Sequence, residues 1–323
     1  MSIDTNRPAT HTGDLELRVR STRTLCTDVR QLVLASAAGT PLPSFTPGSH
    51  VALRWSDGLY NAYSLTGPSI EPEFYTVSVR LDENGRGGSR WAHSLREGDL
   101  VHLRPPRSDF APILTARHHV YVAGGIGVTP VLSHVRAAVD WGRSFQVLYA
   151  FRPGFGAHFD ELTQLCGDRL QAVASATQLE QILDDALADQ PLGTHLYSCG
   201  PRSMIEAVAD AAHAKGWPAA RIHSEAFGSG PLDAGLPFAA KLGRSGMIVP
   251  VPSGTSLLDV LLDKGINVPN LCRQGVCGEC RLSVRGGRIE HRDLYLSEDE
   301  KASGDSMMPC VSRAAGDLLE LEL

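Results

Sequence analysis

Hydrophobic and polar positions alternate along much of the first third of the chain, and turns of Gly, Pro and Asp separate the alternating runs. Alternation with a period of two predicts strands that bury one face, and short strands at even spacing predict an antiparallel barrel or sandwich. One helix-like segment, about Arg90 to Arg96, follows the glycine-rich run 85–89. Residues 1–115 are therefore predicted to form a β-rich domain with strands at 15–25, 29–34, 50–55, 74–80 and 100–103.

The pattern changes at about residue 116, where buried-strand runs begin to alternate with helical spacing. The first of these strands, 119–123, ends in a glycine-rich turn, and Thr129 and Pro130 are placed to cap and to start the next helix. Further strands are predicted at 145–149, 170–174 and 195–198, and further helices at 159–166, 179–187 and 202–215. This β-α-β order predicts a doubly wound parallel sheet in residues 116–228, with its ligand at the carboxyl ends of the strands.

Residues 229–240 have the composition of a linker, and a third unit is predicted in residues 241–323. The segment Thr255–Asp259 resembles a capping box that opens a helix, whose end is marked by Gly265 and Pro269. The strand-like segments of this unit are 247–251, 281–284 and 318–323. We expect a small domain with a mixed sheet and one main helix.

The chain has 323 residues, of which 42% are hydrophobic, and this is enough for two or three domains with their own cores. Its formal net charge of −6 argues against a nucleic-acid binder and provides no basic patch for a membrane surface. Residues 1–14 carry no apolar leader, and no apolar run reaches the roughly 18 residues that span a bilayer. We therefore expect a cytoplasmic monomer without nucleic-acid or membrane partners.

Four of the seven cysteines carry the most specific pattern in the chain. Cys272, Cys277 and Cys280 are spaced C-x4-C-x2-C, and Cys310 follows at a distance. This is the ligand pattern of a plant-type [2Fe–2S] cluster, which needs four thiolates around two irons. The sequence therefore predicts an iron–sulfur cluster in the third domain.

Glycines at 275 and 278 would let the cluster loop wrap the inorganic core and aim backbone N–H groups at its sulfurs. A structural zinc site is the main alternative, but such sites usually use two compact cysteine pairs, and only Cys277 and Cys280 form one here. A disulfide framework is less favoured, because nothing else in the chain is typical of a secreted protein. The other cysteines are expected to be thiols in a reducing compartment: Cys26, Cys166 and Cys199.

Three glycine-rich turns are candidate binding sites. Gly87-Gly88-Ser89 opens the first helix-like segment, where bare backbone N–H groups and the helix dipole suit a phosphate, although such a turn is often an ordinary loop. The turns at 124–127 and 199–201 fall at the same edge of the predicted parallel sheet. A turn of this kind often serves packing alone, but two at one edge favour a dinucleotide.

The predicted cofactors constrain one another. A reduced nicotinamide gives up two electrons as a hydride, whereas a [2Fe–2S] cluster accepts one electron at a time. A carrier between them must hold a half-reduced state, and a flavin does so. The β-rich domain, with its Gly-Gly-Ser turn, is the remaining domain that could hold it. This inference follows from electron counting and not from a flavin motif.

The order of the domains and their motifs resemble the phthalate dioxygenase reductase family, the reductase components of two-component Rieske oxygenases within the broader ferredoxin–NADP reductase-like group. The resemblance covers about Leu15 to Leu323. It implies an antiparallel β-barrel that binds FMN in residues 1–115 and a doubly wound NAD domain in 116–228. A linker at 229–240 then leads to a β-grasp ferredoxin domain in 241–323.

The resemblance also implies roles for individual residues. Asn61-Ala62-Tyr63-Ser64 is similar to the family's Arg-x-Tyr-Ser motif, so Tyr63 would pack on the isoalloxazine and Ser64 would lie near its N5. Gly87-Gly88-Ser89 is similar to the FMN-phosphate turn, and Phe227 stands where the family places an aromatic against the flavin. The pyridine-nucleotide turn would be formed by Gly124, Gly125, Gly127, Thr129 and Pro130, and the nicotinamide-side turn by Cys199, Gly200 and Pro201. The cluster ligands would be Cys272, Cys277, Cys280 and Cys310.

Two of these residues could instead have a purely structural role: Tyr63 as an aromatic of the barrel core and Cys199 as a small buried thiol. The residues expected at the reacting rings are Tyr63, Ser64, Thr129, Cys199 and Phe227.

One residue departs from the family pattern. Asn61 replaces the motif's arginine, which in the family pairs with the flavin phosphate, so a charge-assisted bond is lost. Either flavin affinity is weaker or Arg80 or Arg86 supplies the cation. FMN is favoured over FAD by the Gly87-Gly88-Ser89 turn, although related reductases with a C-terminal cluster use FAD.

NADH is favoured over NADPH, because Arg152 is the single cation between Tyr149 and Arg169, where a 2′-phosphate site usually has several. Arg152 is either a ribose contact or a solvated loop residue.

These observations predict an electron-transfer enzyme. NADH would reduce FMN, and the flavin would pass single electrons through the cluster to a separate oxygenase component that hydroxylates or demethylates an aromatic or small organic substrate. The alternatives are an FAD-containing reductase of another monooxygenase, and a ferredoxin-type carrier or redox sensor that does not oxidise NADH.

Overall fold

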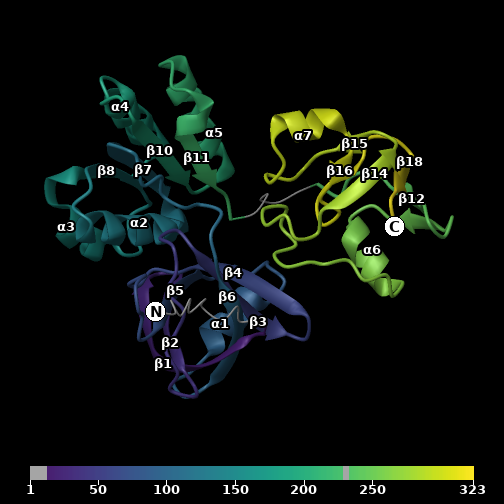
Figure 1. Ribbon diagram of the computed structural model, residues 1–323, viewed down its shortest axis with the longest axis horizontal. Helices are drawn as coiled ribbons and strands as arrows, with labels where there is room; N and C mark the ends of the chain where they lie inside the picture. The colour runs from purple at the N-terminus through teal and green to yellow at the C-terminus, as the bar shows by residue number, and fades with distance from the viewer. Residues whose placement is uncertain (1–12, 228–232) are drawn as a thin grey trace, which may run out of the picture.

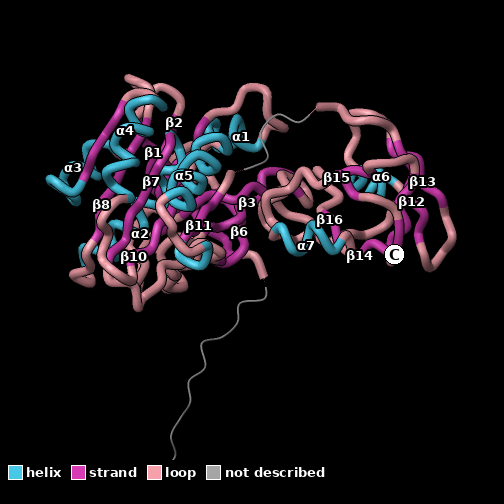
Figure 2. Tube along the Cα trace, turned by 90° about the horizontal axis from the view of Figure 1, so that it is seen from above, coloured by secondary structure: helices cyan, strands magenta, loops and turns pink. Residues whose placement is uncertain are grey.

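The computed structural model describes residues 13–227 and 233–323, which form three units. In Figure 1 a barrel lies at the bottom, a parallel sheet with its helices lies at the upper left, and the C-terminal unit lies at the right. Figure 2 shows the barrel and the parallel sheet as one block with the C-terminal unit beside it. None of the helices in the described part of the chain is long and apolar enough to cross a membrane.

The N-terminal unit is an antiparallel sheet that curls into a barrel. Its strands run in the order β4-β3-β6-β1-β2-β5, and a bridge between Leu65 and Val77 brings the two outer strands together. The alternating apolar positions predicted from the sequence fill the interior, with Leu32, Leu53 and Leu103 fully buried. The strands are β1 (Leu15–Cys26), β2 (Val29–Ser36), β3 (His50–Ser56), β4 (Leu59–Ser64), β5 (Tyr75–Arg80) and β6 (Leu100–Arg107).

Strand β4 was not predicted. All but two of its residues are of intermediate exposure, so it lacks the clean alternation that marks the other strands. It carries the Asn61–Ser64 motif. The short helix α1 (Gly88–Ser94) starts two residues before the predicted Arg90, directly after Gly87 in a left-handed conformation.

The second unit is a five-stranded parallel sheet in the order β11-β10-β7-β8-β9, with helices on both faces. Alternate residues of β7 separate two cores: Tyr121 and Ala123 pack with α2 and α3, whereas Val120 and Val122 pack with α4 and α5. The doubly wound prediction is confirmed. The elements are β7 (His118–Gly124), α2 (Val128–Asp140), β8 (Phe145–Ala150), α3 (Phe159–Cys166), β9 (Leu170–Val173), α4 (Ala176–Leu187), β10 (Thr194–Cys199), α5 (Arg202–Ala214) and β11 (Ile222–Glu225).

Two details of this unit differ from the prediction. Strand β11 was missed, and Thr129 does not cap α2. The turn Gly125–Gly127 is a 3-10 turn that continues into the helix, so α2 already begins at Val128. The Thr129 hydroxyl therefore lies inside the first turn and donates to the Ile126 carbonyl at 3.0 Å.

The third unit is a mixed five-stranded sheet in the order β13-β12-β18-β14-β16, with a two-stranded β15-β17 ladder beside it. Helix α6 (Leu257–Asp263) starts where predicted, because the Ser256 hydroxyl accepts from the Asp259 N–H at 3.0 Å. The capping box Ser297–Glu300 opens α7 (Glu298–Ser303), which was not predicted. The strands are β12 (Phe238–Leu242), β13 (Ile248–Val251), β14 (Leu282–Gly286), β15 (Ile289–Glu290), β16 (Ser306–Met307), β17 (Arg313–Ala314) and β18 (Leu318–Leu321).

The predicted linker 229–240 ends too late. Strand β12 begins at Phe238, pairs with β13 and β18, and buries Phe238 and Ala240 in the core of the third unit. The Gly- and Pro-rich run directly before it concealed its short alternation. Residues 1–12 of the predicted first domain and 228–232 around the linker lie outside the described residues.

Candidate functional site

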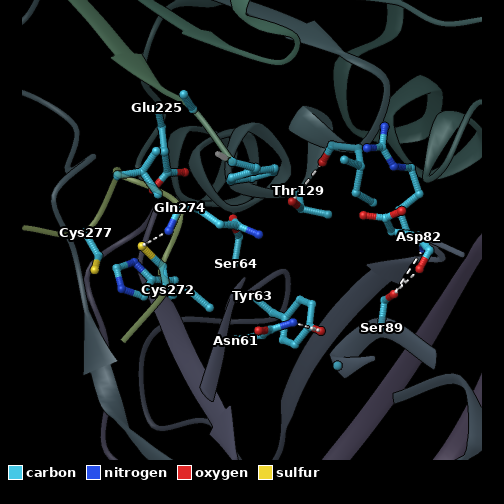
Figure 3. A pocket seen from close by; sticks show the side chains of 18 of the residues that line it. Asn61, Tyr63, Ser64, Asp82, Ser89, Thr129, Glu225, Cys272, Gln274 and Cys277 are labelled. Atoms are coloured by element: carbon cyan, nitrogen blue, oxygen red, sulfur yellow. Dashed lines mark hydrogen bonds between the residues drawn. The ribbon is translucent and has the colours of Figure 1, made fainter. Parts of the chain in front are cut away.

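A cavity of about 400 Å³ lies where the three units meet. Barrel strands β4 and β5 and the 85–89 turn form one side of it, and the segments after β7 and β11 form a second side. The loop that carries Cys272 and Cys277 forms a third side (Figure 3). Its volume is within the range of small-molecule and cofactor sites.

The β4 motif forms the floor of this cavity with Asn61, Ala62, Tyr63 and Ser64. The Tyr63 hydroxyl accepts from Asn61 Nδ2 at 3.3 Å, and burial raises the pKa of Tyr63. Ser64 Oγ is buried and has no hydrogen-bond partner among the described residues. A buried hydroxyl that lacks a protein partner fits a site that a polar ligand fills.

The Gly-Gly-Ser turn lies against Asn61. A Cβ on Gly88 would overlap the Asn61 amide, so glycine is needed where the two segments touch. Gly87 has a φ of 114°, which L side chains rarely adopt. Ser89 Oγ accepts from the Asp82 N–H at 3.0 Å and donates to the Asp82 carbonyl at 3.2 Å. Asn61 thus occupies the expected place of the motif's arginine, beside the predicted phosphate turn.

Two arginines line the cavity near this turn in the sequence. Arg80, at the end of β5, and Arg86, in the turn, both line it. Arg86 Nη2 also donates to the Cys272 carbonyl at 2.8 Å and so joins the turn to the cluster loop. Both positions expected to replace the missing arginine are therefore at the site.

The four predicted cluster ligands form two pairs. Cys280 and Cys310 have their sulfurs 3.4 Å apart, and the Cys272 thiol is hydrogen-bonded to that of Cys277. In the described parts of the chain no three His, Cys, Asp or Glu side chains converge as ligands of a single ion. Two pairs of thiols suit two irons better than one zinc.

The local electrostatics favour a thiolate at one cysteine of each pair, whereas the hydrogen bond to that sulfur, followed by burial, raises the pKa of the partner thiols Cys277 and Cys310. A hydrogen bond from the Cys277 thiol is the main cause that lowers the pKa of Cys272, to about 6, and backbone N–H groups contribute less. One of them, the Gln274 N–H, lies 3.3 Å from the Cys272 sulfur. The Cys310 thiol likewise lowers the pKa of Cys280. Because the thiolate is the form that binds iron, the donor set fits a [2Fe–2S] cluster.

Both glycines of the cluster loop adopt backbone conformations that a side chain would strain. Gly275 and Gly278 have φ values of 73° and 72°, in the left-handed region that favours glycine. A Cβ on Gly278 would also overlap the Tyr295 ring, and the Gly275 carbonyl accepts from the Leu294 N–H at 2.9 Å. The loop can therefore wrap closely around its four thiols.

Comparison with known proteins agrees with this geometry. The family model "2Fe-2S iron-sulfur cluster binding domain" matches residues 241–315, and the model "Dimethylamine monooxygenase subunit DmmA-like, N-terminal domain" matches residues 100–222. The chain is 41% identical to the heme-dependent oxidative N-demethylase beta subunit of Ectopseudomonas mendocina, over 96% of this chain and 99% of that one. It is 40% identical to the carnitine monooxygenase reductase subunit of Escherichia coli, over 95% and 98%.

Among solved structures, phthalate dioxygenase reductase, described as a modular structure for electron transfer from pyridine nucleotides to [2Fe–2S], is similar over 96% of this chain and 98% of that chain. The TM-score is 0.79 and the sequence identity is 34%. The chain belongs to the phthalate dioxygenase reductase-like family. It is a flavin and [2Fe–2S] oxidoreductase of the class that serves as reductase components of oxygenases.

In this family member the two glycine turns of the parallel sheet pack directly on each other. A Cβ on Gly127 would overlap the Cys199 carbonyl, and one on Gly200 would lie 3.0 Å from Gly124. These glycines therefore do serve packing, at the carboxyl ends of β7 and β10. Of the predicted nucleotide residues, Thr129 lines the cavity, whereas the others are outside its lining: Gly124, Gly125, Gly127, Pro130, Arg152, Cys199, Gly200 and Pro201.

Three residues predicted at the cofactors lie in different surroundings. Phe227 is at the cavity wall and is 40% exposed. Cys199 is fully buried, and burial, reinforced by Glu225, raises the pKa of its thiol, which agrees with the small-buried-thiol interpretation. Arg152 is exposed after β8 with its guanidinium 4.5 Å from the Phe155 ring centre. The roles of Cys199 and Arg152 at a nucleotide stay predictions.

Glu225 is a cavity residue that the sequence analysis missed. It is half-buried at the end of β11, and its buried carboxyl oxygen Oε2 has no hydrogen-bond partner in the described chain. Burial, with a smaller contribution from Asp109, raises its pKa to about 8, so it is largely protonated at neutral pH. Its position two residues before Phe227, at a strand end, was the available signal.

Proposed function

We propose that this protein is an NADH-dependent reductase that passes electrons through FMN and the [2Fe–2S] cluster to a separate Rieske oxygenase component, in a system for aromatic hydroxylation or demethylation. One observation carries the proposal: a single cavity is bounded by the barrel motif, by the carboxyl end of the parallel sheet and by two cluster cysteines. An FMN held there would accept a hydride from NADH and release electrons singly.

The residues around the cavity are suited to orient the two rings. Tyr63 comes from β4 and Phe227 follows β11, so aromatic side chains reach the cavity from two domains. If the Phe227 ring moved aside, one face of a bound flavin would be exposed next to Thr129, and a nicotinamide could lie against that face. The reaction needs this positioning more than acid–base chemistry, because hydride transfer depends on the close approach of two ring atoms.

Protons can nevertheless be held at the site. Glu225, protonated near neutral pH, is a buried proton carrier at the cavity wall, and the Ser64 hydroxyl is free to donate toward a ligand. Both groups lack a protein partner among the described residues, so a bound cofactor would satisfy them.

The choice of cofactors rests on charge. We infer FMN because Gly87–Ser89, Arg80 and Arg86 all line the cavity, where they would bind a terminal phosphate. We infer NADH because Arg152 is the single cation between Tyr149 and Arg169 in the sequence.

The exit for electrons lies in the cavity wall itself. Cys272 and Cys277 line the cavity, so cluster ligands and the flavin motif share one space. No separate domain movement is needed for the cluster to receive an electron from that space.

A second partner class is favoured by one comparison. The 41% identical relative is the beta subunit of a heme-dependent oxidative N-demethylase, and the DmmA-like model matches the central part of this chain. The electron acceptor would then be a heme-dependent N-demethylating component in place of a Rieske oxygenase.

The purified full-length chain tests the proposal. We expect an absorption spectrum with both flavin and [2Fe–2S] bands, release of FMN on denaturation, and faster reduction of ferricyanide with NADH than with NADPH. A protein without flavin bands, reconstituted with ample flavin and iron, would contradict it. Release of FAD would correct the cofactor alone.

The two partner classes are separated by electron delivery. The NADH-reduced protein is mixed anaerobically with a purified Rieske oxygenase or with a heme-dependent N-demethylase component, and the acceptor's spectrum is followed. Fast reduction of one and not the other identifies the class.

A further inference from the structure

Ser78 faces the cavity from the middle of β5 and is only 4% exposed. Its hydroxyl lies 2.8 Å from Nε2 of His158, which belongs to the parallel-sheet unit. The other ring nitrogen, Nδ1, lies 2.9 Å from Oε2 of Glu161. A buried Ser–His–Glu chain therefore links the cavity wall to the neighbouring domain.

The Glu161 end of this hydrogen-bonded chain is held in place as well. Arg136 of α2 pairs with Glu161, and Arg136 Nε donates to the Thr66 carbonyl of the barrel at 2.9 Å. His158 itself is held in a left-handed conformation, with φ 58°, at the start of α3. A non-glycine residue persists in that conformation only where its surroundings hold it. The Ser–His–Glu chain is therefore anchored at both ends.

The hydrogen-bond directions in this chain follow from chemistry. A carboxylate accepts and cannot donate, so the proton on the imidazole is on Nδ1 and points at Glu161. Burial, together with Arg136 and Arg23, lowers the pKa of His158 to about 4, so the ring is neutral and Nε2 is an acceptor. Ser78 must donate its single proton to Nε2. Its oxygen then has only lone pairs to offer to a ligand in the cavity that Ser78 lines.

We propose that Ser78 is a positioning residue for the flavin: its oxygen, oriented by His158 and Glu161, accepts a hydrogen bond from a hydroxyl or N–H group of the bound cofactor. This inference rests on the proposed function. It assigns the NAD-domain residues His158 and Glu161 a part in flavin binding, although neither lines the cavity. A ribityl hydroxyl and the ring N3–H are the two donors that a flavin offers.

The test measures flavin affinity of the full chain after removal of its flavin, by quenching of flavin fluorescence. Ser78→Ala and His158→Phe are each expected to raise the dissociation constant of FMN about 5- to 10-fold, the usual effect of one hydrogen bond. The double variant should lose no more than either single variant, because both remove the same interaction. His158→Gln keeps an acceptor toward Ser78 and should recover part of the affinity.

Ser133→Ala is the matched control. Ser133 Oγ accepts from the Gly48 N–H at 3.2 Å, in the same interface between barrel and sheet, and does not line the cavity. This variant should unfold at a slightly lower temperature and bind FMN as the unchanged chain does. Equal losses of FMN affinity in Ser78→Ala and Ser133→Ala would show a general loosening of the interface and overturn the proposal.

Two flavin analogues separate the donor groups. Lumiflavin lacks the ribityl chain and riboflavin keeps it. If Ser78→Ala weakens both, the donor is the ring N–H; if it weakens riboflavin alone, the donor is a ribityl hydroxyl. FMN affinity of Ser78→Ala within twofold of the unchanged chain would refute the inference. Failure of the unchanged chain to bind any flavin would instead refute the proposed function.

Discussion

The barrel contacts the parallel sheet through buried side chains, whereas it contacts the cluster loop through partly exposed ion pairs. On the first side Phe110, 3% exposed, packs edge-on against His134 and Tyr197, and the barrel residue Val29 belongs to the same hydrophobic cluster as α2 and α3. On the second side Glu279 lies 3.2 Å from Arg107 and 3.9 Å from Arg104, and the Arg107 side chain is 62% exposed. The core of the cluster domain contains only its own residues, from Phe238 onward.

This difference matches the two transfers that the proposed function requires. Hydride transfer needs two rings held at a fixed distance, and a shared dry core resists displacement. Electron transfer to the cluster has no such atomic contact to preserve, and the cluster must also be presented to a protein acceptor. Exposed ion pairs hold two surfaces loosely, with about 0.2–1 kcal/mol per pair. The barrel and sheet therefore act as one body, and the cluster domain is attached to it more weakly.

The largest effect should come from Phe110→Ala in the buried interface. Truncation of a buried Phe removes apolar contacts and leaves a cavity, so we expect a loss of about 3–5 kcal/mol in the free energy of unfolding. Urea denaturation followed by circular dichroism measures this loss. An exposed ion pair such as Arg107–Glu279 contributes less than about 1 kcal/mol. If Phe110→Ala lost no more than that, the buried interface would be no stronger than the one formed by ion pairs.

Acid should weaken the same interface. Burial lowers the pKa of His134 to about 3 and of His158 to about 4, from 6.5. Between the folded and unfolded pKa values of these histidines the unfolded chain binds more protons, so the stability that they contribute is complete above pH 6.5 and falls as pH decreases toward 4. Glu225 opposes this trend, because its raised pKa makes the folded state bind a proton from pH 4.5 to about 8.

A variant isolates one histidine from these opposing groups. His158→Phe should flatten the pH dependence below pH 6.5 by about 1.4 kcal/mol per pH unit, and by about 3 kcal/mol in total. The measurement is urea denaturation at several pH values between 4.5 and 7.5. Ser133→Ala removes a group that does not titrate from the same interface and should keep the slope of the unchanged chain. Identical slopes for His158→Phe and the unchanged chain would show that His158 titrates normally.

The cluster loop should respond to Gly278→Ala more than to a similar change elsewhere in its domain. A side chain here adopts a strained φ of 72° and meets the Tyr295 ring, and the left-handed conformation alone costs about 1–2 kcal/mol. We expect a lower iron content and weaker [2Fe–2S] absorption, with unchanged FMN binding. Gly304→Ala is the control, because its φ is 66° but nothing lies within 4 Å of the added Cβ. Equal iron loss in both variants would mean that strain alone, and not the fit of the loop, is responsible.

A site could be predicted from the sequence when its residues lie close together along the chain, and not when the fold brings distant residues together. The cluster ligands lie mostly within nine residues, and the glycine turns directly follow strands, so the local sequence was enough to predict them as candidate sites. Ser78 and His158 are separated by 80 positions, and nothing in either local sequence indicates their contact. Glu225 has its unusual pKa only because the fold buries it.

The boundary errors have equally physical causes. The cap predicted at Thr129 was wrong because a 3-10 turn moved the helix start. β4 and β12 were missed because mixed exposure and a neighbouring Gly- and Pro-rich run obscured their patterns. In each case the three-dimensional context outweighed the local signal.

The smallest effect, and the one that tests the weaker interface directly, should come from Glu279→Gln. Loss of the carboxylate removes the pairs with Arg104 and Arg107 and leaves the Arg86 bond to the Cys272 carbonyl in place. Electron transfer from flavin to cluster, followed by stopped-flow absorption after NADH reduction, should slow by up to about fivefold at low salt, which corresponds to about 1 kcal/mol. Because salt screens exposed charges, the rate of the unchanged chain should fall as ionic strength rises, and that of the variant should not.

Glu322→Gln removes an exposed pair with Arg285 that lies within the cluster domain, and it should behave as the unchanged chain does. If the Glu279→Gln rate kept the salt dependence of the unchanged chain, contacts other than these ion pairs would hold the cluster domain. The cluster-side interface could then not be described as electrostatic.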